Sequence, residues 1–468
     1  MIKRISNYKV WTPVLVFASL LVSLEAISGP TAPSLHKNFP EESFVPGQLY
    51  VDNELLVKFK PSVSSLGIGS LLTSYRLQSL EQIPRIGVHR LKTLDRQSFE
   101  KTLAALKQMP SVEYAEPNYI LSLADVPNDP YFPYQWAMQN IGQTVGPLER
   151  YPFSHGTPGH DISAAMAWDL STGSETTKVG VVDTGLDLGH PDLIHNILSE
   201  GRNFFDPQDT AKDDHGHGTH VSGTIAAEGN NGIGVSGVCW KAKILPAKVF
   251  DNNARGPTSS VINGIIYVTD QGVRVINMSL GGGDIVVTQA LADAIRYSYE
   301  RGVVLVAAAG NDGVPGVWYP AAYDDYVLAA SATDFNDTYM SLQTTDGTWG
   351  SNYGPEVDVA APGYFILSTW GRGLNFRQRP GWYGYNYGNK TSMSTAFVSG
   401  LAALILSYHP ELTNRQVMQV IRYSAEDVNA AQYPGRDIFI GWGRINARRA
   451  LYLADFFVNR PRVPMPLR

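Results

Sequence analysis

The hydrophobic pattern of the chain is dominated by one long apolar run, residues 390–408 (KTSMSTAFVSGLAALILSY). Its first residues are small and hydroxylated, and the rest are mostly apolar. Apolar residues on every side of a helix indicate that the helix is buried inside the protein. Ser392 and Thr395 are good helix-start residues, so the run predicts a core helix with a polar N-terminal end.

Strands and helices alternate through the region that precedes this helix. Short apolar runs that predict strands are separated by stretches with helical spacing at residues 262–269 and 288–301. Such alternation predicts an α/β fold with a doubly wound parallel sheet flanked by helices. The predicted strands are residues 178–183, 243–250, 273–280, 303–310 and 327–332.

The first residues of the chain have the pattern of a signal peptide. Lys3, Arg4 and Lys9 give a positive start, and residues 10–24 are largely apolar. A single membrane anchor is the alternative, but the run is short for a span of about 20 residues and contains Pro13. We therefore expect residues 1–28 to direct export, so that the protein is secreted, either extracellular or periplasmic.

A smaller unit follows, with a pattern different from that of the later chain. Alternating runs at residues 54–60, 86–91 and 112–123 predict strands, and residues 96–109 have helical spacing. These elements predict a small α+β domain, and the Pro-rich residues 124–136 follow it. The boundaries that we expect are 29–124 for this domain, 125–458 for the α/β domain and 459–468 for a flexible tail.

The net charge limits the classes of binding partner, and the cysteine content limits how the protein can be stabilised. A net charge of −6 and a pI near 5.9 argue against nucleic acid or an anionic membrane as the main partner. The single cysteine, Cys239, excludes an intramolecular disulfide. An exported protein without disulfides needs another form of reinforcement, and bound calcium is a candidate.

Three polar residues at the ends of predicted elements have the chemistry of a nucleophilic site. Asp183 ends a strand, His217 begins a small-residue helix in HGTH, and Ser392 begins the core helix. A serine hydroxyl is a weak nucleophile until a base takes its proton, and a carboxylate orients that base. The unpaired N–H groups of a helix N-terminus stabilise negative charge on a carbonyl under attack. Ser392 alone could simply cap a core helix, but the other two motifs favour catalysis.

These motifs, in the order Asp, His, Ser, resemble the signature segments of the subtilisin-like serine proteases, the subtilases. The resemblance covers about residues 128–457 and extends to a prodomain before them. Residues 161–175 resemble the family's first helix, and the insertion between residues 371 and 389 is expected to be a surface loop near the site. It implies a serine endopeptidase that is made as a self-processing zymogen and cleaves proteins or peptides through an acyl-enzyme. Its own prodomain would be an intramolecular inhibitor. We expect the enzyme to be a monomer without a nucleic-acid partner.

The resemblance also implies roles for residues around the triad. Asn311 in AAAGNDG would be an oxyanion donor, although an Asn in a Gly-flanked turn is common. Ser279, Leu280 and Gly281 would pair with an extended substrate; a nucleotide-binding loop at SLGGG lacks the matching motif. Trp318 would fill the floor of the specificity pocket and favour small residues before the scissile bond, which makes Ala124 a candidate for self-cleavage.

The resemblance also predicts a calcium site, and two residues of this chain differ from the family pattern. The resemblance implies Asp129, Asp192 and Asn231 as side-chain ligands of a structural Ca²⁺; alternatively they are turn residues. Lys390 stands where the family has Gly, and Ala396 where it has Pro. Because of these departures, an inactive subtilase that binds peptides without cutting them is the competing hypothesis.

Overall fold

The computed structural model describes residues 50–94, 99–119, 126–146, 154–282, 288–345, 347–374 and 383–459. The chain divides into two units, Met1–Ile120 and Leu121–Arg468. The expected signal peptide, the junction at Ala124 and residues 460–468 of the expected tail lie outside the described residues. The domain boundaries given above therefore stay predictions.

The first unit contains a four-stranded antiparallel sheet in the order β2-β3-β1-β4. Leu55, Val57 and Phe59 alternate along β1 and enter one core together with residues of α2. The predicted α+β unit is confirmed, but α1 and β2 were not predicted because α1 buries none of its residues and β2 buries only its first. The elements are β1 (Tyr50–Phe59), α1 (Ser65–Ser74), β2 (Leu77–Ile83), β3 (Val88–Thr93), α2 (Phe99–Lys107) and β4 (Val112–Tyr119).

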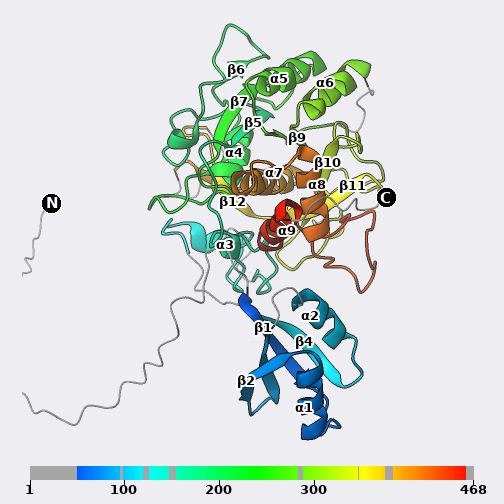
Figure 1. Cartoon of the computed structure of the whole chain (residues 1–468). Helices are drawn as coiled ribbons and strands as arrows, with labels where there is room; N and C mark the ends of the chain where they lie inside the picture. Colours follow the sequence, from blue (N-terminus) through cyan, green and yellow to red (C-terminus); the bar gives the residue numbers. More distant parts are fainter. Residues whose placement is uncertain are drawn as a thin grey trace, which may run out of the picture. The chain divides into compact units, whose positions relative to one another are not determined.

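The second unit is organised around a seven-stranded sheet in the order β11-β10-β9-β8-β5-β7-β6 (Figure 1). Every pair of neighbouring strands is parallel, as the alternation of strands and helices predicts. The strands are β5 (Lys178–Asp183), β6 (Arg202–Asn203), β7 (Lys243–Lys248), β8 (Val275–Met278), β9 (Val304–Ala308), β10 (Val327–Thr333) and β11 (Val357–Pro362).

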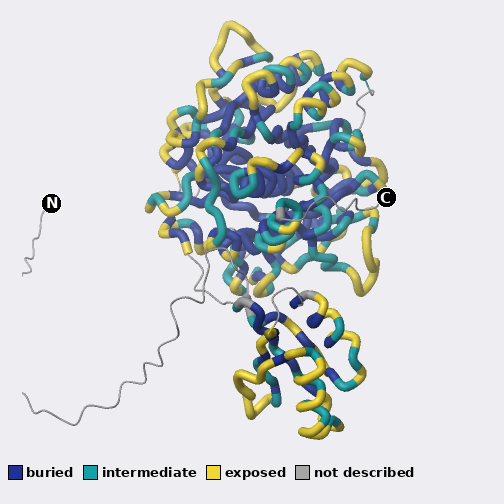
Figure 2. Tube along the Cα trace, viewed as in Figure 1, coloured by how far each residue is buried: buried dark blue, intermediate teal, exposed yellow. Residues whose placement is uncertain are grey.

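Helices cover both faces of this sheet because successive side chains of a strand point to opposite sides. Val181 packs into one core with residues of α4 and α7, whereas Val182 packs into the other with residues of α5 and α6. Figure 1 shows α5 and α6 on one face and α7, α8 and α9 on the other. Figure 2 shows buried residues along the strands and α7, and exposed residues along the outer sides of α5 and α6. The helices are α4 (His217–Ala226), α5 (Thr258–Asp270), α6 (Gln289–Glu300), α7 (Thr391–Tyr408), α8 (Asn414–Ser424) and α9 (Ala447–Asn459).

The central helix α7 confirms the prediction of a buried apolar helix. Residues Thr391 to Leu406 are all buried, and α7 packs against five strands, β5 and β8 to β11. Among the described residues, α7 is also the helix long and apolar enough to cross a membrane. The apolar composition of α7 is explained by its burial between the sheet and the neighbouring helices.

Two local expectations need correction. The helix expected over residues 161–175 is a single turn, α3 (Ala164–Ala167), bounded by Ser163 with φ 54° and followed by Gly173 with φ 103°. The insertion around residues 371–389 is partly regular, since β13 (Tyr385–Gly388) pairs antiparallel with β12 (Ile366–Thr369). α3 packs against α9, which lies near the end of the chain, and the backbone of β13 pairs with that of β12. Local spacing in the sequence reveals neither contact.

Candidate active site

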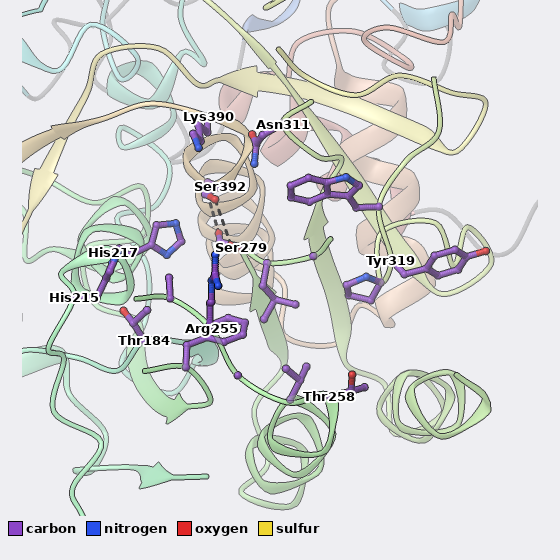
Figure 3. A pocket seen from close by; sticks show the side chains of 18 of the residues that line it. Thr184, His215, His217, Arg255, Thr258, Ser279, Asn311, Tyr319, Lys390 and Ser392 are labelled. Carbon is purple, nitrogen blue, oxygen red and sulfur yellow. Dashed lines mark hydrogen bonds between the residues drawn. The ribbon is translucent and has the colours of Figure 1, made fainter. Parts of the chain in front are cut away.

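The polar residues singled out above meet at one edge of the parallel sheet. Asp183 ends β5, Ser279 follows β8 and Asn311 follows β9, while α4 and α7 begin with His217 and Thr391. Because the carboxyl ends of parallel strands share an edge, segments far apart in sequence converge there. A cavity of about 670 Å³ opens at this edge (Figure 3). Its lining includes His217, Ser279, Leu280, Gly281, Asn311, Trp318 and Ser392.

His217 and Asp183 form the closest polar pair of the site. The distance from His217 Nδ1 to Asp183 Oδ1 is 2.7 Å, and Asp183 is 1% exposed. Burial lowers the pKa of His217, but the charge and hydrogen bond of Asp183 outweigh it and leave the pKa raised. The imidazolium is therefore stabilised where it would form, and Nε2 is left to face the cavity.

Asp213 holds the start of α4 in place, and its hydrogen bonds come from backbone N–H groups and hydroxyls rather than from the His217 ring. Its Oδ1 accepts the N–H of Gly216 at 2.8 Å, and its Oδ2 accepts the N–H of Thr219 at 2.9 Å. The neighbouring Asp214 pairs with Lys248 at 2.6 Å. Asp183 is thus the acid hydrogen-bonded to His217. The second histidine of HGTH, His220, bonds the carbonyl of Ile366, and burial lowers its pKa to about 4.

Ser392 lies at the second position of α7, 6% exposed. Its hydroxyl donates to the carbonyl oxygen of Ser279 at 3.3 Å, and the Ser279 hydroxyl donates to the carbonyl of Ser392 at 2.8 Å. No hydrogen bond joins Ser392 and His217 within the described part of the chain. Both side chains line the same cavity, however, and Figure 3 shows the ring and the hydroxyl on neighbouring walls. A change of the Ser392 χ1 rotamer redirects Oγ without moving the backbone.

Asn311 is held by the residue that precedes the serine. Its Oδ1 accepts two hydrogen bonds from Thr391, one from the backbone N–H at 3.0 Å and one from Oγ1 at 2.9 Å. With the oxygen engaged, the amide nitrogen is the free end, and Figure 3 shows it on the cavity side. The first N–H groups of a helix have no intrahelical partners, so two kinds of N–H donor meet beside Ser392.

The expected substrate-binding residues line the same cavity. Ser279 to Gly281 follow β8, and Gly282 forms a bridge with Tyr319 on the facing loop. Trp318 packs between two glycines: a Cβ atom at Gly281 would lie 3.1 Å from its Cβ, and one at Gly310 would lie 2.9 Å from its Cδ2. Its Nε1 donates to Asp312 Oδ2 at 3.0 Å, which orients the indole. The indole is therefore fixed as part of the cavity lining.

The expected calcium ligands also come together. Asn231 Nδ2 lies 2.9 Å from Asp192 Oδ1, and Asp129 accepts the backbone N–H groups of Asn230 and Asn231. Asp129 and Asp192 are 2% and 0% exposed, and no Lys or Arg pairs with either within the described ranges. Burial raises the pKa of Asp192 to about 7. Two buried carboxylates beside an amide suit a hard cation. Asn231 Oδ1 accepts the N–H of Ile233 at 2.9 Å, so Ca²⁺ binding here would require the Asn231 amide to break this bond and turn its oxygen towards the carboxylates.

Several cavity residues were not predicted as site residues. The described lining also includes Thr184, His215, Phe250, Ala254, Arg255, Gly256, Thr258, Val261, Leu291, Tyr319, Pro320 and Lys390. Many come from the loop at residues 250–258, which lies more than 130 residues before Ser392 in the chain. The signal available in the sequence was its turn-rich DNNARGP segment, but nothing local showed that this turn would face the site.

Comparisons with known proteins agree with this geometry. Residues 174–443 match the subtilase family model, and residues 41–118 match the fervidolysin N-terminal prodomain. A thermophilic serine proteinase of Bacillus sp. (strain AK1) is 34% identical over 86% of this chain and 88% of its own. Thermitase of Thermoactinomyces vulgaris is 37% identical over 69% of this chain and 99% of its own. A solved protease from Pseudoalteromonas arctica, 29% identical, covers 70% of this chain and 99% of its own with a TM-score of 0.57. The chain therefore belongs to the subtilase family and is a subtilisin-like serine protease with an N-terminal prodomain.

Proposed function

We propose that this chain is a secreted endopeptidase that hydrolyses peptide bonds in proteins, with Ser392 as nucleophile, His217 as general base and Asp183 as the orienting carboxylate. The observation that carries the proposal is the 2.7 Å bond from His217 to Asp183 beside a cavity that Ser392 shares. Asn311 supports it, because its amide oxygen is already engaged and its nitrogen is free to donate.

The proposed reaction begins when His217 Nε2 accepts the proton of the Ser392 hydroxyl as Oγ attacks the substrate carbonyl. The carbonyl oxygen becomes an anion that the Asn311 amide and the backbone N–H of Ser392 stabilise. His217 then gives the proton to the leaving amine as the C–N bond breaks, which leaves an acyl-enzyme. The same imidazole then takes a proton from water as the water oxygen attacks the ester, and it returns that proton to Ser392 Oγ as the ester C–O bond breaks and the second product leaves.

The substrate would bind in an extended conformation. Ser279, Leu280 and Gly281 follow a strand and line the cavity, so their backbone groups are available to pair with a peptide as an added strand. Trp318 lines the same cavity and packs against Gly281 and Gly310. We therefore propose small residues, Ala, Ser or Gly, immediately before the scissile bond.

The remaining proposals concern maturation and stability. The prodomain match supports synthesis as a zymogen whose residues 29–124 act as an intramolecular inhibitor and are removed after Ala124 by self-cleavage. The mature enzyme, residues 125–458, would act outside the cytoplasm as a monomer. Asp129, Asp192 and Asn231 would hold a Ca²⁺ that neutralises two buried carboxylates.

A serine-directed probe tests the proposal most directly. A fluorophosphonate should label the purified wild-type enzyme at Ser392, and labelling should be lost in Ser392→Ala and fall sharply in His217→Ala. Ser394→Ala is the matched control, because the Ser394 hydroxyl bonds the carbonyl of Ala361 inside the core. A folded wild-type enzyme that neither takes up the probe nor cleaves casein would support the competing hypothesis of an inactive peptide binder.

A further inference from the structure

We propose that the cleft selects acidic peptide segments, with Arg255 recognising carboxylates before the scissile bond and Lys390 recognising them after it. The inference rests on the proposed protease function and adds a substrate class to it. It concerns residues outside the triad, the oxyanion donor and the specificity pocket.

The charge of the cleft is opposite to that of the whole chain. Arg255 and Lys390 both line the cavity, and both are exposed. The described lining residues include no Asp or Glu. Asp183 lies behind His217 and is 1% exposed, so substrate cannot reach it. A chain with net charge −6 therefore presents two cations and no carboxylate to its substrate. Such a local field attracts anionic segments and repels basic ones.

Lys390 occupies a position that disfavours lysine for two physical reasons. It is the N-cap of α7, with φ 98° and ψ 171°, a conformation that is essentially confined to glycine. Its ammonium also lies at the positive end of the helix dipole. Its side chain makes no capping hydrogen bond and has no carboxylate partner among the residues that the structure describes. Strain of this kind at an active site suggests that the side chain serves binding rather than folding.

The position of Lys390 relates it to the leaving-group side of the substrate. Ser279 to Gly281 would pair with the residues that precede the scissile bond. Figure 3 shows Lys390 on the opposite side of Ser392 from Ser279, on the side where Asn311 also lies. The ammonium also lowers the pKa of His217, opposing the larger effect of Asp183, so its field reaches the imidazole that would protonate the leaving amine. A carboxylate that follows the scissile bond would meet this cation.

Arg255 lies on the other side of the nucleophile. Its loop is fixed by Asp251, whose Oδ1 accepts the backbone N–H groups of Asn253 and Arg255 at 2.9 Å each. Those bonds use the backbone of Arg255, and no ion pair involves its guanidinium within the described chain. Figure 3 shows the side chain reaching into the cavity towards Ser279. A guanidinium there can bind a substrate carboxylate through two parallel N–H···O bonds.

The experiment compares peptides that differ by one charge. The mature enzyme is given fluorogenic peptides with Ala before the scissile bond and Glu, Gln or Lys at one of two positions. One position immediately follows the bond, and the other lies two residues before it. At low salt we expect kcat/KM to be about 5- to 10-fold higher for Glu than for Lys at each position, with Gln between them. In 0.5 M NaCl the ratio should fall to about 2 or less, because salt screens exposed charges.

Single substitutions should separate the two positions. Lys390→Met should abolish the preference after the bond and leave the preference before it, and Arg255→Met should do the reverse. Lys390→Arg is the matched control, because it keeps the charge and the β-carbon at the strained position while changing the shape of the cation. If Lys390 had only a structural role, Lys390→Met would change kcat/KM for all peptides by the same factor.

The neutral peptide separates this inference from the proposed function. Cleavage of the Gln peptides by wild type but not by Ser392→Ala supports the protease, whatever the charge preference. Equal kcat/KM for Glu and Lys peptides, with the Gln peptides cut normally, overturns the acidic preference and leaves the protease intact. Failure to cut any peptide, by a folded enzyme, overturns both.

Discussion

Thr391 and Asn311 are joined by two hydrogen bonds, in which the backbone N–H and the hydroxyl of Thr391 both donate to the same amide oxygen. This relationship couples the start of the helix that carries Ser392 to the loop that follows β9. It also sets which end of the Asn311 amide faces the cavity. An oxyanion donor has to be fixed before reaction in order to lower the barrier.

The two bonds predict that Thr391 positions Asn311. Thr391→Val removes the hydroxyl donor and keeps the backbone N–H, so kcat should fall about 3- to 10-fold with KM nearly unchanged. Thr391→Ser restores the hydroxyl and should recover most of the rate. Steady-state kinetics on one neutral peptide measures both variants, and an unchanged kcat in Thr391→Val would remove the positioning role.

Substitution of Asn311 should lower kcat more than substitution of Thr391. Asn311→Ala deletes the donor, and we expect kcat to fall about 10²- to 10³-fold, a range established for a subtilisin. The melting temperature measured in parallel separates a lost donor from a damaged loop. A variant that keeps full kcat would show that the backbone N–H groups of α7 stabilise the oxyanion without help.

Asp183→Asn should impair catalysis through the tautomer of His217. An amide can donate a hydrogen bond to Nδ1, which moves the proton to Nε2 and blocks that atom as a base. We expect kcat to fall by about 10⁴ at neutral pH, by analogy with other Ser-His-Asp proteases. Asp214→Asn is the control, since Asp214 pairs with Lys248 and not with the histidine. A similar loss in both variants would contradict the assignment.

The pH dependence follows from the charges around His217. Burial and the charge of Lys390 lower the pKa of His217, but Asp183 and Asp213 raise it by more. The neighbouring His215 has a lowered pKa, mainly because of its burial. The base acts in its neutral form, so activity is lost as pH falls through a pKa above the ordinary histidine value. Removing the cation in Lys390→Met favours the imidazolium, so the acid limb of kcat/KM should move to higher pH. Lys390→Arg should leave it in place, and a shift to lower pH in Lys390→Met would reverse the electrostatic argument.

Trp318 predicts a narrow specificity pocket. Trp318→Ala opens space beside Gly281 and Gly310, so kcat/KM for peptides with Phe before the scissile bond should rise about 10- to 100-fold. Peptides with Ala there should change much less, which provides the internal control. N-terminal sequencing of the mature wild type is an independent measurement. A start that follows a large aromatic residue would count against the pocket.

Calcium should contribute to stability. An ion at 100 times its Kd adds about 2.7 kcal/mol, so chelation with EGTA should lower the melting temperature of the mature enzyme by several degrees. Asp129→Asn should lower it in calcium and reduce the response to EGTA. Asp334→Asn serves as a control, because that carboxylate accepts loop N–H groups outside the candidate site. A melting temperature of the wild type that does not change with EGTA would contradict the proposed calcium site.

Some elements were predictable because their cause is local. The strand that ends at Asp183 and the helix that starts at Thr391 follow from runs of apolar residues with polar residues at their ends. Elements with weak patterns were missed or misjudged: α1 buries none of its residues, and the helix expected over residues 161–175 is one turn. Whether α1 forms and how short α3 is depend on tertiary contacts rather than on the local sequence pattern.

The sequence by itself determined the alternation of strands and helices in the α/β domain and supplied a carboxylate, an imidazole and a hydroxyl at the ends of three of its elements. These features depend on residue type and on spacing along the chain, which are local properties. Only the tertiary structure decided that the Asp183 carboxylate meets the His217 ring, that Thr391 orients Asn311, and that Arg255 and Lys390 face one cavity. Distances, burial and the charge of a cleft depend on which distant segments pack together, and packing is a property of the whole fold.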